Sequence, residues 1–457
     1  MQRMKPSVKN SRVQKKGDWG KMKKYAVALL AALCLLTVSG GMASAKIYVD
    51  IDSPSFQPIP IAVCDFVASP DAPAAWDISL PEKIRKDLTL TGLFNVLNKK
   101  SFLEDASSRS ALTADTIRFE DWTAIGADYL LKGNLLKKDD DIIVEGVLFD
   151  VVRGAQILRK RYRTDAAHLK TVSRALVSDI LLALINDEGD FNTAIAFVSK
   201  TGAKSDLYVI GYDGEDLKKI TNHQSIVISP RWSPDGRDVA FTSYRDGHPE
   251  VYIRNLKNGT ERKVSSFPGL NLCGAFSPDG SKLLLTLSKD RTEEIYALEL
   301  SSMKLKRLTN SFAINVSPTW SPDGKKIAFV SNRSGSPQIY VMDADGNNVR
   351  RLTYEGTYNT SPSWSPRGDR IAYEGLTDNR YQIFTIDLDG NHPVQLTSDA
   401  ANNESPVWSP SGRQMVYLSR SGSKSKMVIM NSNGSCPRIL HEQNSLLLTP
   451  SWSPRLK

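Results

Sequence analysis

The sequence predicts an α+β N-terminal domain followed by a six-bladed all-β propeller that the C-terminal strand closes. Three observations lead to this prediction. A Trp-Ser-Pro-Asp-Gly motif, with variants, recurs at a constant spacing of 44 residues in the second part of the chain. Residues 46–190 lack this spacing and show both helical and strand-like patterns. The last copy of the motif, at Trp452, stands at the end of the sequence with no strand after it.

Residues 1–45 are interpreted as a secretory signal sequence. Met22–Ala45 has a basic start, an apolar run and a small-x-small end, which predicts cleavage between Ala45 and Lys46. Met22 is a candidate for the true start. The apolar run at 26–38 is too short to span a bilayer, so we expect an exported protein without a membrane span.

Charge and cysteine content narrow the class of protein. The formal net charge is +9, but residues 1–45 hold nine Lys or Arg and one Asp, so the remainder has 50 basic and 49 acidic residues. This near-neutral remainder has no general attraction for nucleic acid. The mature chain keeps Cys64, Cys273 and Cys436, and this odd number argues against a disulfide scaffold. We expect the three cysteines to be buried in the core as small hydrophobic residues.

The region 46–190 is expected to form the α+β domain, bounded by the acidic segment 186–190. Lys46–Asp52 alternates apolar and polar residues and predicts a first strand. The further expected elements are a buried strand at 59–66, a helix at 81–90 that Pro81 opens, antiparallel strands at 127–136, 142–151 and 156–164, and a helix at 167–185.

The region 191–457 is expected to form the propeller. Ser-Pro-Asp-Gly suits a type I turn between two strands, and each 44-residue unit contains four strand-like segments. Units of this length with four strands predict propeller blades. The motif begins at Trp232, Phe276, Trp320, Trp364, Trp408 and Trp452. An aromatic column at Tyr208, Tyr252, Tyr296, Tyr340 and Phe384 is interpreted as packing between blades.

The final motif copy predicts how the ring closes. The first unit contains the strand that begins at Ile195, but the slot six periods before Trp452 lacks the motif. We therefore expect the C-terminal segment to pair with the Ile195 strand as the innermost strand of that blade. Such closure removes the free edges of an open array.

Motifs for catalysis were sought and not found. Gly-x-Ser-x-Gly, the Walker loop, Gly-x-Gly-x-x-Gly and His-Glu-x-x-His are all missing from the sequence. The Asp-x-Asp-Gly segments at 343–346 and 387–390 resemble pieces of a calcium loop but are explained by turn formation. We expect no enzymatic activity, no cofactor and no metal site.

The loops between blades are the candidate interaction surface. Six windows of 12 residues join one blade to the next, and four successive windows are apolar at their centre. These centres are Leu446–Leu448, Ile226–Ile228, Leu270 with Leu272, and Ile314 with Val316. They are expected either to line a packed channel or to form an apolar docking sector. A second set of loops on the same face adds a basic rim of Lys200, Arg245, Lys289, Arg333 and Arg420.

The chain resembles the TolB family of the bacterial Tol–Pal system. The resemblance is carried by the order of the two domains, by Lys46–Phe66, by Ser266–Leu283 and by the final Pro-Ser-Trp-Ser-Pro. It implies a monomeric, non-catalytic periplasmic adaptor that supports outer-membrane integrity and constriction at cell division. Members of this family bind the peptidoglycan-associated lipoprotein Pal through the propeller loops and TolA through the mature N-terminus.

The resemblance also implies which residues make these contacts. The Pal-binding windows hold Leu270, Asn271, Cys273, Val316 and Ser317, to which the apolar sector adds Ile226 and Leu447. Relatives often have polar residues or His where this chain has Leu270 and Val316. The TolA-binding segment corresponds to Lys46, Ile47, Tyr48, Val49, Asp50, Ile51 and Asp52. A carbohydrate- or peptidoglycan-binding propeller is the alternative, and a peptidase-type propeller is disfavoured because no nucleophile motif is found.

Overall fold

The computed structural model describes residues 53, 56–72, 76–103, 112–138, 141–165 and 167–456. The predicted signal sequence, its cleavage site between Ala45 and Lys46, and the Lys46–Asp52 segment lie outside the described residues. Among the described helices, none is long and apolar enough to cross a membrane.

The N-terminal domain is built on one mixed sheet with the strand order β3-β1-β4-β5-β6, and β2 pairs with β4. Strand β1 is parallel to both β3 and β4, whereas β4, β5 and β6 follow one another as antiparallel neighbours. The predicted buried strand and the three antiparallel strands are therefore confirmed. The bounds are β1 Ile59–Val63, β2 Val67–Ala68, β3 Phe94–Val96, β4 Tyr129–Lys138, β5 Asp141–Asp150 and β6 Ala155–Thr164.

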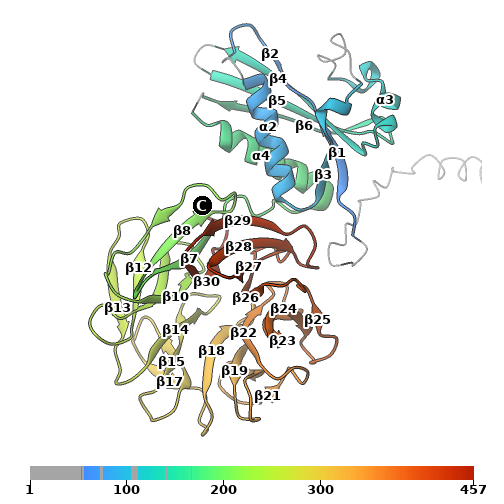
Figure 1. Ribbon diagram of the computed structural model, residues 1–457. Helices are drawn as coiled ribbons and strands as arrows, with labels where there is room; N and C mark the ends of the chain where they lie inside the picture. The colour runs from blue at the N-terminus through green and yellow to red at the C-terminus, as the bar shows by residue number, and fades with distance from the viewer. Residues whose placement is uncertain are drawn as a thin grey trace, which may run out of the picture. The chain divides into compact units, whose positions relative to one another are not determined.

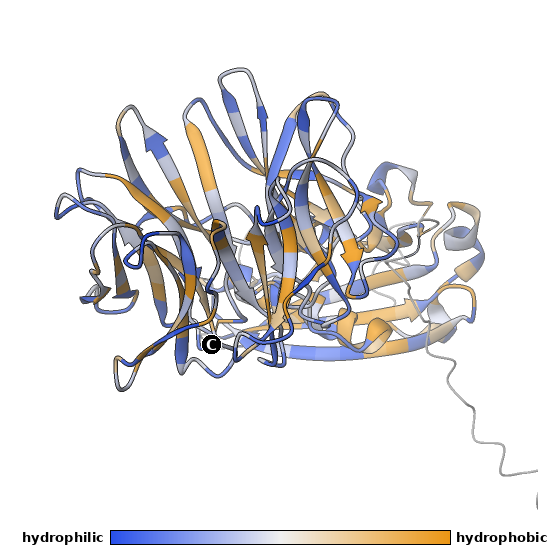
Figure 2. Cartoon of the chain, turned by 90° about the horizontal axis from the view of Figure 1, so that it is seen from below, coloured by the Kyte–Doolittle hydropathy of each residue, from blue (hydrophilic) through white to orange (hydrophobic). Residues whose placement is uncertain are grey.

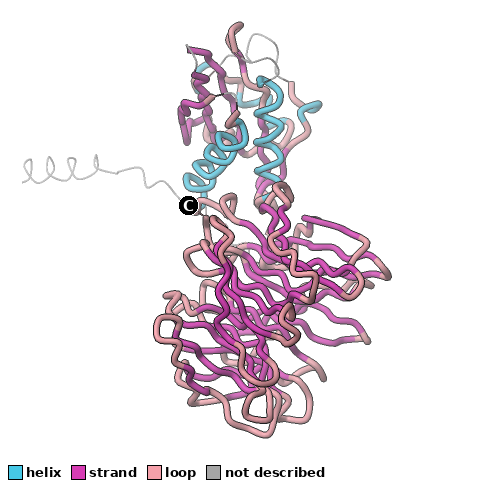
Figure 3. Tube along the Cα trace, turned by 90° about the vertical axis from the view of Figure 1, so that its left-hand side faces the viewer, coloured by secondary structure: helices cyan, strands magenta, loops and turns pink. Residues whose placement is uncertain are grey.

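The described residues of this domain form three α-helices: α2 (Trp76–Leu90), α3 (Phe119–Ala124) and α4 (Leu169–Ile185). Helix α4 buries the predicted apolar stripe of Val172, Leu176, Ile180 and Leu184. As Figure 3 shows, helices are confined to this domain, and the described part of the propeller contains strands and loops only.

The predicted start of α2 at Pro81 was wrong. The helix begins five residues earlier, at Trp76, and Pro81 lies inside it. Because proline has no backbone N–H, Pro81 leaves the carbonyl of Asp77 without its partner within the helix. The Phe66 N–H donates to that carbonyl at 3.0 Å. A hydrogen bond from outside the helix thus makes the internal proline tolerable.

The propeller consists of six four-stranded antiparallel sheets arranged as blades (Figure 1). Five blades are consecutive in sequence: β10–β13, β14–β17, β18–β21, β22–β25 and β26–β29. Their strands are β10 Val227–Trp232, β11 Asp238–Ser243, β12 Glu250–Asn255, β13 Glu261–Ser265, β14 Asn271–Phe276, β15 Lys282–Leu287, β16 Glu294–Glu299, β17 Leu305–Arg307, β18 Asn315–Trp320, β19 Lys326–Ser331, β20 Gln338–Asp343, β21 Arg350–Arg351, β22 Asn359–Trp364, β23 Arg370–Thr377, β24 Arg380–Asp387, β25 Val394–Gln395, β26 Asn402–Trp408, β27 Gln414–Ser421, β28 Lys424–Asn431 and β29 Arg438–Gln443.

The sixth blade combines both ends of the propeller, in the order β30-β7-β8-β9. The C-terminal strand β30 (Leu446–Trp452) runs antiparallel to β7 (Ala194–Thr201), and Trp452 is directly opposite Ile195. Strands β8 (Lys204–Gly211) and β9 (Lys218–Lys219) complete the sheet. The Trp452 indole N–H donates to Thr193 Oγ1 at 2.9 Å. The predicted closure by the C-terminal strand is confirmed.

Hydrophobic segments lie mainly along strands and helices, and several strands also carry hydrophilic stretches (Figure 2). The aromatic column packs between blades, as predicted, because Tyr252 and Tyr296 each lie in a core cluster with residues of the preceding blade. Tyr252 is fully buried and stacks on Phe241 with ring centroids 6.1 Å apart, and Tyr373 stacks on Phe384 at 5.5 Å. Of the three cysteines, Cys64 and Cys273 are buried as expected, whereas Cys436 is exposed.

Candidate interaction face of the propeller

The two predicted sets of loops do share one face of the propeller. The interblade windows follow the outermost strand of each blade, and the second set joins the second strand to the third. Backbone hydrogen bonds join the two sets at equivalent positions in four blades. They run from the N–H groups of Tyr244, Ser288, Asn332 and Leu376 to the carbonyl groups of Ile226, Leu270, Ile314 and Tyr358. These bonds hold each interblade window against the neighbouring loop.

A buried polar cluster fixes the conformation of each of two polar windows. Gln338 Oε1 accepts hydrogen bonds from Thr353 Oγ1 at 2.7 Å and from Asn359 Nδ2 at 2.8 Å. Gln382 Oε1 accepts the same pair of bonds 44 residues later, from Thr397 and Asn403. Because each cluster joins the third strand of one blade to the first strand of the next, it also connects neighbouring blades.

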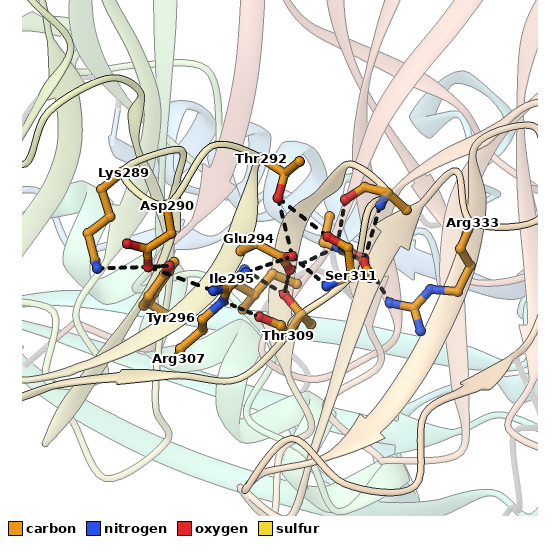
Figure 4. Close-up of polar contacts among 12 residues, drawn as sticks. Lys289, Asp290, Thr292, Glu294, Ile295, Tyr296, Arg307, Thr309, Ser311 and Arg333 are labelled. Atoms are coloured by element: carbon orange, nitrogen blue, oxygen red, sulfur yellow. Dashed lines mark hydrogen bonds and ion pairs between the residues drawn. The ribbon is translucent and has the colours of Figure 1, made fainter.

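Glu294, in β16, is the residue equivalent to Gln338 in the unit before it, and it holds the apolar window 309–320 in the same way. Its fully buried carboxylate accepts hydrogen bonds from Thr309 Oγ1, from the Ser311 N–H at 2.7 Å and from Asn315 Nδ2 at 3.0 Å. The Arg307 guanidinium supplies the opposite charge at 3.1 Å. Figure 4 shows Arg307, Thr309 and Ser311 around Glu294. A buried charge with this many donors is compensated and rigidly held.

The predicted basic rim is largely neutralised. Arg245 pairs with Glu261, Lys289 lies 2.8 Å from Asp290, and Arg420 pairs with Glu404. Arg333 donates to Asn315 Oδ1 at 2.9 Å and lies over the Tyr340 ring. Four of the five basic side chains therefore have partners within their own blades. The rim does not form a continuous surface of unpaired positive charge.

Glu261 is a second acid on this face with several donors. Burial would raise its pKa, but hydrogen bonds from His223, Arg254 and Arg245 outweigh that effect and lower the pKa of Glu261 to about 2. His223 belongs to the window 221–232 and Arg245 to the neighbouring loop. The Glu261 carboxylate therefore connects the window 221–232 through His223, the neighbouring loop through Arg245, and β12 through Arg254.

The residues predicted to bind Pal fall into two groups. Ile226 is 39% exposed, and Leu270 and Val316 are partly exposed. Asn271, Cys273 and Leu447 are buried and have structural roles. Asn271 Oδ1, for example, accepts bonds from Ser265 Oγ and the Phe267 N–H. Ser317 lines a central cavity of the propeller together with Cys273.

Sequence reasoning missed the most exposed aromatic side chain on this face. Phe312 lies in the window 309–320 and is fully exposed, and Ile314 nearby is 45% exposed. A signal was present, because the other units place only small or polar residues at the position of Phe312. These residues are Gln224, Pro268, Gly356, Ala400 and Asn444. An aromatic side chain that departs from its repeat is not required by blade packing.

Comparison with known proteins identifies the family. The family model described as the TolB beta propeller domain matches residues 183–456, which is more than half of the chain. The model described as the TolB amino-terminal domain matches residues 47–157.

The chain belongs to the TolB family.

Curated relatives support this assignment. The chain is 47% identical over 220 residues to a Tol-Pal system protein TolB from Syntrophus aciditrophicus, covering 47% of this chain and 48% of the relative. It is 35% identical over 216 residues to the protein of the same name from Anaeromyxobacter dehalogenans, covering 47% of this chain and 49% of the relative. The chain thus spans about half the length of the curated relatives it matches.

The likeness in structure extends over more of the chain. The crystal structure of TolB from Acinetobacter baumannii superposes with a TM-score of 0.76 at 29% sequence identity. The superposition covers 87% of this chain and 97% of that one. This TolB family member therefore has the six-bladed propeller and the smaller domain of mixed helices and strands predicted from its sequence.

In the described parts of the chain, His, Cys, Asp and Glu form no group of three or more that is placed to hold a metal ion.

Proposed function

We propose that this protein is a periplasmic, non-catalytic adaptor of the Tol–Pal system. In this proposal the loop face of the propeller binds the lipoprotein Pal, and Lys46–Asp52 binds TolA. Together these contacts would support outer-membrane integrity and constriction at division. Membership of the TolB family and the names of its curated relatives, Tol-Pal system proteins TolB, support a role in the Tol–Pal system.

One observation on the propeller carries the Pal-binding proposal. Phe312, Ile314 and Ile226 are exposed on the loop face, in windows that lie within three successive interblade connections. Leu270, in the window between them, is partly exposed. Large apolar side chains exposed together on a rigid surface are typical of a protein-binding site. Leu270, Val316 and Ser317 stay in the proposal, whereas buried Asn271, Cys273 and Leu447 would support the face from beneath.

The proposal for TolA rests on the resemblance alone. The alternating pattern of Lys46–Asp52 suits a strand that adds to the sheet edge of a partner. Removal of Lys46–Asp52 is therefore expected to abolish the binding of TolA.

The experiment measures Pal binding by calorimetry with the double variant Phe312→Asp, Ile314→Asp. We expect a loss of more than about 2 kcal/mol of binding free energy, because the variant places two charges in an apolar contact. Tyr354→Asp is the matched control, since Tyr354 is 68% exposed in the next window, outside the apolar sector. Equal affinity of wild type and double variant would rule out this sector. Recovery of peptidoglycan fragments without lipoprotein from envelope extract would favour the carbohydrate-binding alternative instead.

A further inference from the structure

The centre of the propeller contains a cavity of about 210 Å³. Its lining comes from the innermost strand of every blade: β10, β14, β18, β22, β26 and β30. The cavity therefore lies on the axis of the ring. A water molecule occupies about 30 Å³ in the liquid, so a cavity of this size holds several waters or a small organic ion.

Arg231 is the only charged residue among the described residues that line this cavity. The equivalent positions in the other units are all small or medium-sized and uncharged. These residues are Ala275, Thr319, Ser363, Val407 and Ser451. The ring therefore leaves open space beside a single guanidinium, and a packing role does not require an arginine at this position.

The guanidinium has few partners of its own. Within the described part of the protein, the hydrogen bond found for it runs from Nη1 to the Pro230 carbonyl at 2.9 Å, and no carboxylate lies within ion-pair distance. A guanidinium carries five N–H donors, and among the described residues only one hydrogen bond of the Arg231 side chain is found. Burial lowers the pKa of Arg231, but arginine remains charged in proteins. Arg231 is partly exposed, and removing part of a charged group from water without a counter-ion is costly.

The acid Glu374 is bonded to Ser405, which lines the cavity, and no ion pair between Glu374 and Arg231 is found among the described residues. Its Oε1 accepts from Thr360 Oγ1 at 2.6 Å, and its Oε2 accepts from the Ser405 N–H at 2.7 Å. Because both carboxylate oxygens have donors already, Glu374 does not provide the counter-charge for Arg231.

Hydroxyl groups surround the same space. Five of the six units place Ser or Thr at one lining position, and these are Ser229, Ser317, Ser361, Ser405 and Thr449. All five have positive φ, between 43° and 56°, at the bulge of the innermost strand. Hydroxyl groups are both donors and acceptors, so they can bind the oxygens of an anion that a guanidinium holds.

We propose that the central cavity binds one small oxyanion, a carboxylate or a tetrahedral anion, through the Arg231 guanidinium and the surrounding hydroxyl groups. Two parallel N–H···O bonds from a guanidinium suit either kind of anion. This site lies on the propeller axis, and it does not depend on the proposed binding of Pal or TolA.

The test uses the full chain and measures binding of sulfate, phosphate and succinate by calorimetry in a chloride buffer of constant ionic strength. We expect one anion per chain, and at least tenfold weaker binding by Arg231→Gln. Arg237→Gln is the matched control, because Arg237 is an exposed arginine on the turn that follows the same strand. The preferred anion distinguishes a tetrahedral ligand from a carboxylate. No binding by the wild type, or equal binding by Arg231→Gln, would overturn the proposal.

A second measurement guards against misfolding of the variant. Crystals of the wild-type protein soaked in selenate should show an anomalous peak within hydrogen-bond distance of the Arg231 guanidinium. Water alone in the cavity, or a selenate peak only at the surface, would refute the site whatever the variant does.

Discussion

At the scale of single residues, the loop face depends on buried amide and hydroxyl groups. Asn359 is 2% exposed, and its Nδ2 donates to Gln338 Oε1 and to the Glu355 carbonyl, each at 2.8 Å. We predict that Asn359→Ala lowers the free energy of unfolding by about 1–3 kcal/mol, because the Glu355 carbonyl and one site on Gln338 lose their donor. Urea denaturation measures this change. Asn347→Ala, in an exposed turn, should change stability by less than about 0.5 kcal/mol.

Glu261 gives a prediction about pH. Its pKa is lowered from an ordinary 4.5 to about 2 in the folded protein. The folded state therefore gains stability from the ionised carboxylate above about pH 4.5, and this gain is lost as the pH falls towards 2. We predict that wild type melts at a higher temperature than Glu261→Gln at pH 7, and that the difference shrinks between pH 4.5 and 2.5. Thermal unfolding of both proteins across this range is the measurement, and a constant difference would contradict the prediction.

The residue scale is also where prediction from sequence was least complete. The repeat located the windows, but a period cannot distinguish a side chain that points inwards from one that points outwards. Asn271 and Leu447 were therefore grouped with Ile226, although they are buried and Ile226 is exposed. Departures from the repeat were more informative than the repeat itself, since Phe312 and Arg231 both differ from every equivalent residue.

At the scale of elements, the strands and the C-terminal ends of α2 and α4 could be predicted closely, whereas the start of α2 could not. The period-2 and 44-residue patterns placed the strands within a few residues, because alternation reports directly which face is buried. Pro81 misled the prediction for α2, since proline usually marks the first turn of a helix. Its place inside α2 depends on the Phe66 N–H reaching the Asp77 carbonyl, a contact between segments that local sequence does not reveal.

The end of α4 provides a test at this scale. Asn186 caps the helix in the left-handed conformation with φ 58°, and its N–H donates to the Leu182 carbonyl at 3.1 Å. We predict that Asn186→Ala lowers the free energy of unfolding by about 1 kcal/mol, because alanine is strained in this conformation. Asn186→Gly should differ from wild type by only a few tenths, since glycine adopts positive φ readily. Equal losses for the two variants in urea denaturation would show that backbone strain is not the cause.

At the scale of the whole molecule, six equal units and one displaced motif were enough to predict the ring and its closure. Regular spacing specifies neighbours that all pack alike, so the fold follows from repetition. The position of Lys46–Asp52 and the partners of the loop face do not follow from repetition. They depend on surfaces that only one unit or one segment carries, such as Phe312 and Ile314.

Closure of the ring gives the final prediction. Deleting Thr449–Lys457 removes Trp452, which is 7% exposed, and with it the bonds from Trp452 Nε1 to Thr193 and from Arg455 to Asp187. The deletion also leaves the edge of β7 unpaired along half its length. Loss of a buried tryptophan alone costs about 3–5 kcal/mol, so we expect the melting temperature to fall by about 10 °C or more. Calorimetry measures the shift, and adding the peptide Thr449–Lys457 in excess should restore part of it by pairing with the part of β7 that the deletion leaves unpaired. A deletion variant that melts like wild type would mean that the other five blades hold the ring closed without β30.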